Sequence, residues 1–130
     1  MTGPNPFAKL EDFNSVTGNI TETRVRDYSG RHSHFYLDIF VWSKGSYYLS
    51  ESSRERIDRY FAAVPTNGPI TIHFRDDLTG HRIYDARDGD RIFIPFNDVM
   101  AKIIRGQILV LAFAGLFALL GWLAWRRDSN

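Results

Sequence analysis

Two patterns of hydrophobic residues divide the chain. Between residues 17 and 96, apolar and polar positions mostly alternate, which is typical of half-buried β-strands. Residues 106–125 instead form one almost continuous apolar run. The pattern therefore predicts a small β-rich domain over residues 17–96, followed by one hydrophobic helix.

Three strands are expected in the first half of the domain, at residues 19–28, 33–42 and 46–50. Turns at Ser29-Gly30 and Lys44-Gly45 separate them. In the second strand, alternation assigns Phe35, Leu37 and Ile39 to the core side. The opposite face then carries His34, Tyr36, Asp38, Phe40 and Trp42.

A helix is expected after the third strand. Ser52 as N-cap and Glu55 at N3 would form a capping box. Pro65 ends the segment. The apolar residues at helical spacing are Ile57, Tyr60, Phe61 and Val64.

Two or three further strands are expected up to residue 96, with a hairpin turn at Asp88-Gly89. Three strands, a helix and two or three strands define an α+β fold. It is either a small antiparallel sheet or an OB-like barrel, whose helix also follows the third strand. Residues 1–16 are interpreted as an N-terminal segment in which Pro6 could start a short helix.

Residues 97–127 are interpreted as a juxtamembrane and transmembrane helix with its span at about 106–125, followed by a tail at 128–130. Twenty helical residues rise roughly 30 Å, the thickness of the hydrocarbon core. Basic residues flank the run, and tryptophans mark its C-terminal end: Lys102, Arg105, Arg126 and Arg127, with Trp122 and Trp125.

The flanking charges do not decide the orientation, because two basic residues stand on each side. No signal-peptide pattern precedes the domain, so a cytosolic domain avoids exporting most of the chain. We therefore expect a single-pass protein of a bacterial-type inner membrane, with the domain in the cytosol and the lipid bilayer as its first partner.

Composition narrows the chemistry. The formal net charge is +1, so the overall balance does not call for a polyanionic partner. The chain has no Cys, which excludes disulfides, thiolate catalysis and Cys-ligated zinc. The sequence also contains no glycine-rich phosphate loop and no nucleophile elbow. We expect a protein that is not an enzyme and uses no cofactor.

A metal site is the alternative that the histidines raise. His32 and His34 lie two residues apart, and His73 could join them from a later strand. Histidines on a solvated strand face would give the same pattern, and we favour that interpretation. The acidic residues around Asp88-Gly89 lack the spacing of a calcium loop and are assigned to a turn.

The aromatic outer face favours protein interaction. Exposed aromatic and arginine side chains are enriched in interfaces. The candidate interaction face comprises Tyr36, Phe40, Trp42, His34, Arg24 and Arg26. The same face could instead be covered by the N-terminal segment, or bind single-stranded nucleic acid or another anionic ligand. The interleaved acidic residues argue against nucleic acid.

In the apolar helix, Ala114, Ala118 and Gly121 form a small-residue stripe that could pack on another helix, which leaves a homo-oligomer open. The expected function is that of a non-enzymatic interaction or accessory subunit of a membrane assembly. The alternatives are an OB-like ligand-binding domain and a histidine metal site.

Overall fold

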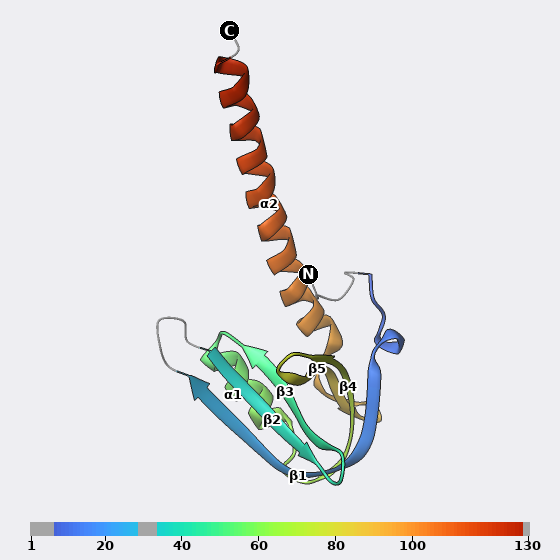
Figure 1. The fold of residues 1–130 in the computed structure, drawn as a ribbon. Helices are drawn as coiled ribbons and strands as arrows, with labels where there is room; N and C mark the ends of the chain where they lie inside the picture. The colour runs from blue at the N-terminus through green and yellow to red at the C-terminus, as the bar shows by residue number, and fades with distance from the viewer. Residues whose placement is uncertain (1–6, 29–33, 129–130) are drawn as a thin grey trace.

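The computed structural model describes residues 7–28 and 34–128 (Figure 1). Over these ranges it shows a β-rich domain from which one long helix projects. The elements in chain order are a 3₁₀ turn at Leu10–Asp12, β1 Asn14–Tyr28, β2 His34–Val41, β3 Gly45–Glu51, α1 Arg54–Ala63, β4 Gly68–Asp77, β5 Gly80–Asp88, β6 Arg91–Ile94 and α2 Phe96–Asp128. The predicted α+β class with a C-terminal helix is confirmed.

β1 is the long central strand of the sheet. Its first half, from Asn14 to Ile20, pairs with β4, and its second half, up to Tyr28, pairs with β2. The change of partner coincides with a register irregularity between Ile20 and Glu22. Gly18 lies close to this point, where a Cβ would stand 2.7 Å from Cγ1 of Val41. A side chain at position 18 would therefore force the buried Val41 side chain to shift.

The strand order is β3-β2-β1-β4-β5-β6, with an additional pairing between β3 and β5. That pairing is parallel and joins Tyr48 to Arg82. All neighbouring strands along the order pair antiparallel. β3 and β5 stand four places apart in this order, and their pairing closes the sheet on itself. Strands β1 to β5 therefore surround the core.

The alternation in β2 is confirmed: Phe35, Leu37 and Ile39 are buried. The isoleucines of β4 and β5 face the same core, and α1 covers it with Ile57, Tyr60 and Val64. Phe61 differs from the expected stripe, since 39 % of it stays exposed.

The N-cap of α1 is Ser53, so the expected capping box at Ser52 and Glu55 is wrong by one residue. The Ser53 hydroxyl accepts a hydrogen bond from the backbone N–H of Arg56 at 3.3 Å. The backbone N–H groups of Ser52 and Ser53 both donate to Oε1 of Glu51, which fixes this later start.

α2 joins the domain without a linker. The backbone N–H of Phe96, in its first turn, donates to Oδ1 of Asp85 at 3.1 Å. Val99 and Met100 are buried in the core, and Ile103 packs against it. Lys102 donates to the carbonyl oxygen of Ser50 at 3.1 Å. The first two turns of α2 are therefore part of the domain.

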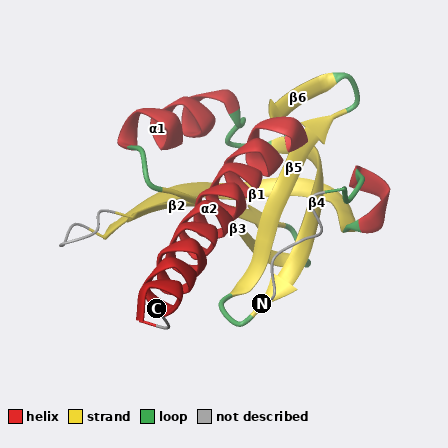
Figure 2. Cartoon of the chain, turned by 90° about the horizontal axis from the view of Figure 1, so that it is seen from above, coloured by secondary structure: helices red, strands yellow, loops and turns green. Residues whose placement is uncertain are grey.

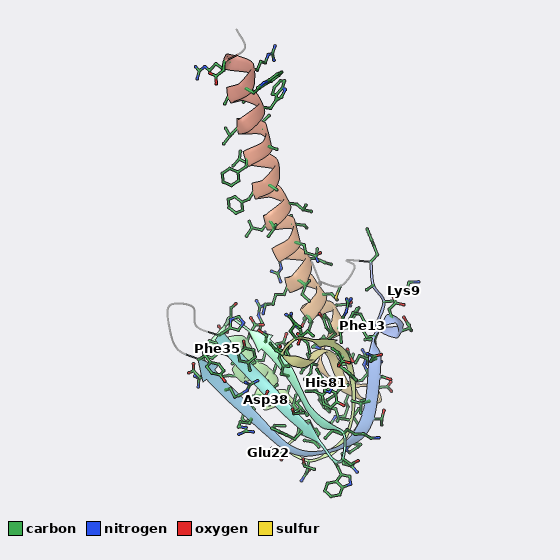
Figure 3. All side chains as sticks on the ribbon, viewed as in Figure 1. Lys9, Phe13, Glu22, Phe35, Asp38 and His81 are labelled. Atoms are coloured by element: carbon green, nitrogen blue, oxygen red, sulfur yellow. The ribbon has the colours of Figure 1, made fainter. Side chains whose placement is uncertain are left out.

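Beyond these turns α2 projects from the domain, and its apolar side chains are exposed (Figure 3). It is the one helix in the described ranges that is long and apolar enough to cross a membrane. Seen from above, α2 passes over β1–β3, and its C-terminal end lies at the same edge of the view as the turn between β4 and β5 (Figure 2).

Candidate binding pocket

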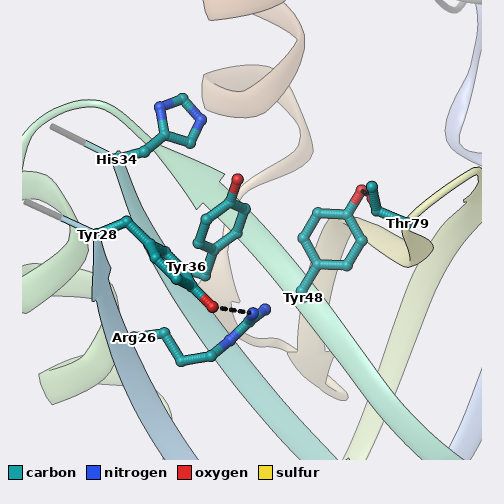
Figure 4. Close-up of a pocket in the computed structure, with 6 residues that line it drawn as sticks. All are labelled: Arg26, Tyr28, His34, Tyr36, Tyr48 and Thr79. Atoms are coloured by element: carbon teal, nitrogen blue, oxygen red, sulfur yellow. Dashed lines mark hydrogen bonds between the residues drawn. The ribbon is translucent and has the colours of Figure 1, made fainter. Parts of the chain in front are cut away.

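A hollow of about 280 Å³ opens on the outer face of β1–β3 (Figure 4). Three tyrosines, an arginine, a histidine and a threonine line it: Arg26, Tyr28, His34, Tyr36, Tyr48 and Thr79. We refer to these six residues as the tyrosine pocket.

Strand register brings most of the lining together. Arg26 of β1 is paired with Tyr36 of β2, and Tyr28 is paired with His34. On the other side of β2, Tyr48 of β3 is paired with Asp38, two residues from Tyr36. Since residues two apart on a strand share a face, these side chains all project to the outer side. Thr79 comes from the β4–β5 turn.

The rings form a continuous row across three strands. Tyr36 lies in the middle, with ring-centre distances of 5.6 Å to Tyr28 and 6.0 Å to Tyr48, both edge-on. The His34 ring is 5.3 Å from Tyr36. Edge-to-face contacts of this kind stabilise aromatic clusters beyond their buried area. They hold the walls of the pocket in place.

Arg26 is neutralised inside the pocket wall. Its Nε and Nη2 donate to the two carboxylate oxygens of Asp38, the second at 2.9 Å. Asp38 is 7 % exposed, and its hydrogen bond is the main reason that the pKa of Arg26 is raised. The guanidinium also lies 4.7 Å from the ring centre of Tyr36. The pocket therefore carries little net charge.

The β4–β5 turn fixes the opposite rim. Oδ1 of Asp77 accepts hydrogen bonds from the N–H groups of Thr79 and Gly80, each at 2.9 Å. The Tyr48 hydroxyl donates to Oδ2 of Asp77. Burial and this contact raise the pKa of Tyr48 to about 12. Burial acts to raise the pKa of Asp77, but its hydrogen bonds outweigh burial and lower it.

Two polar groups remain near the centre. His34 Nε2 is 2.8 Å from the hydroxyl oxygen of Ser50. The hydroxyl of Tyr36 has no hydrogen bond to any of the residues that the structure describes. The Tyr28 hydroxyl accepts a hydrogen bond from Nη1 of Arg26 at 3.3 Å (Figure 4). The pocket thus combines aromatic walls with hydroxyl groups that a ligand could engage.

The candidate interaction face divides into three parts. Arg26, His34 and Tyr36 meet in the pocket. Arg24 and Phe40 form a separate pair farther along the sheet, with the guanidinium carbon 5.1 Å from the ring centre. β2 ends at Val41, so Trp42 stands in the β2–β3 turn, 70 % exposed, at the far end from the pocket.

The histidines do not converge. His32 lies outside the described residues. His34 is paired with Tyr28 at one end of β1, whereas His73 is level with Ser15 at the other end. In the part of the chain that the structure describes, no three His, Asp or Glu side chains are grouped as a metal ion would require.

The sequence did not place three of the lining residues in the candidate interaction face, and it did not predict the burial of Asp38, Glu51 and Asp85. Tyr28 and Tyr48 carried a usable signal, since strand pairing with β2 places them beside His34 and Tyr36. Thr79 carried none. Asp85 is one of the acidic residues near Asp88-Gly89 that the sequence assigned to a turn. It lies in β5 instead, where it is completely buried and accepts hydrogen bonds from Nε and Nη2 of Arg87 at 2.7 and 2.8 Å.

In α2, Ala114, Ala118 and Gly121 are exposed, as is the rest of the apolar run. Comparison of the chain with protein-family models, curated proteins and solved structures finds no match. The pocket and the apolar helix are the two features of the described residues that bear on function.

Proposed function

We propose that this protein is a non-enzymatic recognition module, held at a membrane by α2, that acts as an accessory subunit of a membrane assembly. The tyrosine pocket is its contact with a protein partner. The observation that carries the proposal is the row of three tyrosine rings around a hollow large enough for one side chain.

The chemistry of the pocket favours binding. Arg26 is engaged by Asp38, Tyr48 by Asp77 and His34 by Ser50. A catalytic acid or base is usually poised near neutral pH, whereas the pKa of Tyr48 is shifted away from it. Rigid, amphipathic tyrosine rings with paired charges are instead the composition of an interface centre.

The membrane assignment rests on the exposed apolar length of α2. As part of this proposal we place α2 in a bacterial-type inner membrane, with the domain on its cytosolic side.

A second candidate is an OB-like ligand-binding domain. The parallel β3–β5 pair and the position of α1 between β3 and β4 favour such a barrel. OB-folds bind ligands on the face of their second and third strands, beside the loops that include the β4–β5 connection. The tyrosine row would then stack on a ring-bearing ligand such as a single-stranded nucleic acid. The pairing of Arg26 with Asp38 argues against a strongly anionic one.

Photo-crosslinking in native membranes tests the primary proposal. A benzoylphenylalanine at position 36 should give one discrete protein adduct. The same residue at position 92, which is half exposed on β6, is the matched control and should give none. Equal labelling from both positions, or no adduct from position 36, would contradict a protein partner at the pocket.

Binding of labelled oligonucleotides to the full-length protein separates the two candidates. Salt-dependent binding that Tyr36→Ala weakens would favour the OB-like alternative. Absence of binding at low salt would remove it.

A further inference from the structure

We infer that the domain rests directly on the lipid surface, with Leu78 of the β4–β5 turn inserted into the headgroup region of the bilayer that α2 enters. This inference depends on the proposed membrane anchor and adds a second contact between the protein and the same membrane.

The distance along α2 leaves little room between domain and lipid. Ile103 is the last residue of α2 that packs against the core, and the uncharged run begins at Ile108. Five residues at ~1.5 Å rise correspond to about 8 Å. The headgroup region on each side of a bilayer is roughly 5–7 Å thick. The end of the domain from which α2 leaves therefore lies at the level of the headgroups.

The attachment of α2 also restricts tilting. Asp85 bonds the first turn of α2, and Lys102 bonds the end of β3 through the carbonyl oxygen of Ser50 and the carboxylate of Glu51. The helix is continuous from Phe96 to Asp128. A domain held in this way cannot swing away from the membrane on a flexible connection.

The β4–β5 turn lies at this end of the domain, on the side toward which α2 leans (Figures 1 and 2). Leu78 occupies its tip and is the most exposed large apolar residue in the described ranges, at 107 %. A fully exposed apolar side chain thus projects from the end that faces the membrane.

The turn is built to hold Leu78 outward. Asp77 accepts hydrogen bonds from Thr79 and Gly80, and Tyr48 donates to the same carboxylate. Gly80 has a φ of +137°, a backbone conformation that glycine adopts readily and other residues rarely adopt. A fully exposed leucine on a hydrogen-bonded turn suits a shallow lipid contact, because lipid can cover its side chain without any rearrangement of the turn.

The position of Leu78 also places the tyrosine pocket. Thr79, its immediate neighbour, forms the rim of that pocket. A Leu78 in the headgroups brings the pocket mouth to the lipid surface. Its partner would then approach along the membrane plane, as a membrane-bound protein does.

Site-directed spin labelling of the full-length protein tests the inference. The native chain lacks Cys, so each introduced cysteine is the only one. Single variants Leu78→Cys, Trp42→Cys and Leu116→Cys are labelled and reconstituted in mixed phosphatidylcholine and phosphatidylglycerol vesicles. A water-soluble nickel complex is present on both sides of the membrane, and its collisions with the label are compared with those of oxygen.

The label at position 78 should lose collisions with nickel and gain collisions with oxygen, toward the values at position 116 in α2. The label at position 42, in the β2–β3 turn at the opposite end of the domain, should stay fully aqueous. An aqueous label at 78 beside an immersed label at 116 would overturn the inference and leave the anchor intact. An aqueous label at 116 would overturn both.

Discussion

Lys102 of α2 places its ammonium nitrogen 3.3 Å from Oε1 of Glu51 at the end of β3. Glu51 is 3 % exposed, so this ion pair is partly buried at the surface of the domain. Burial lowers the pKa of Lys102, and the attraction of Glu51 offsets only part of that effect. The pair joins the apolar helix to the sheet.

Glu51→Gln should therefore lower the free energy of unfolding by about 1–3 kcal/mol. Removing one partner of a buried pair costs about 3–5 kcal/mol, and the partial exposure of Lys102 reduces this. Urea unfolding of the full-length protein in detergent measures the effect. Glu55→Gln is the control, because its pair with Arg59 is exposed and should contribute less than about 0.5 kcal/mol.

The loss in Glu51→Gln should also depend on pH. An unpaired, partly buried Lys102 has a folded-state pKa below its unfolded value. The variant is then least stable while Lys102 is charged, and it regains stability as rising pH removes that charge. A loss that stays constant from neutral to alkaline pH would show that Lys102 is not the group responsible.

Asp85→Ala should lower the free energy of unfolding more than Glu51→Gln does. The side chain is fully buried, neutralises Arg87 and accepts the first N–H of α2. We expect a loss of about 3–5 kcal/mol in the free energy of unfolding, measured in urea. Asp90→Ala, in the exposed β5–β6 turn, should change it by less than about 0.5 kcal/mol. Similar losses in both variants would contradict the assigned role of Asp85.

Gly18→Ala should destabilise the sheet where β1 changes partner. The added methyl group would lie 2.7 Å from the Val41 side chain, which forces a shift in a packed core. Overpacking of this kind costs about 1–3 kcal/mol. Gly106→Ala is the control, since its methyl group would meet no atom within 4 Å. Thermal unfolding followed by circular dichroism should separate the two variants.

Tyr48 makes stability sensitive to alkali. Its folded-state pKa of about 12 lies above the ordinary value of 10.0. The neutral phenol therefore contributes stability that is complete below pH 10 and is lost as pH rises toward 12. The tyrosinate absorbance of the wild type minus that of Tyr48→Phe should show a midpoint near 12. A midpoint near 10 would mean that Tyr48 is not buried against Asp77.

Local pattern was enough to predict most of the strands and the apolar helix, although β1 begins at Asn14, five residues before the predicted strand. The alternation in β2 identified Phe35, Leu37 and Ile39 as core residues because one face of that strand is buried. The length and lack of charge of residues 108–125 identified the exposed part of α2. Both signals depend only on residues close together in the sequence.

Features that depend on contacts between residues far apart in the sequence could not be predicted from local pattern. Thr79 reaches the pocket because the β4–β5 turn lies against Tyr48 of β3, a contact between residues more than 30 positions apart. Asp85 is buried because Arg87 and the start of α2 satisfy its oxygens, whereas hydrophobic periodicity assigns an aspartate to solvent. The shift of the N-cap to Ser53 has the same origin in the Glu51 side chain.

The continuous junction between domain and α2 has a consequence for how this protein meets its neighbours. In an α-helix each residue advances the chain by about 100° around the axis. The number of residues between Ile103 and the lipid therefore sets the rotation of the domain about the axis of α2. This rotation decides which way the tyrosine pocket faces in the plane of the membrane. Inserting one alanine there would turn the pocket by about a quarter of a circle without altering any contact inside the domain. Inserting seven alanines adds about two full turns of helix, so the pocket would face almost the original direction again.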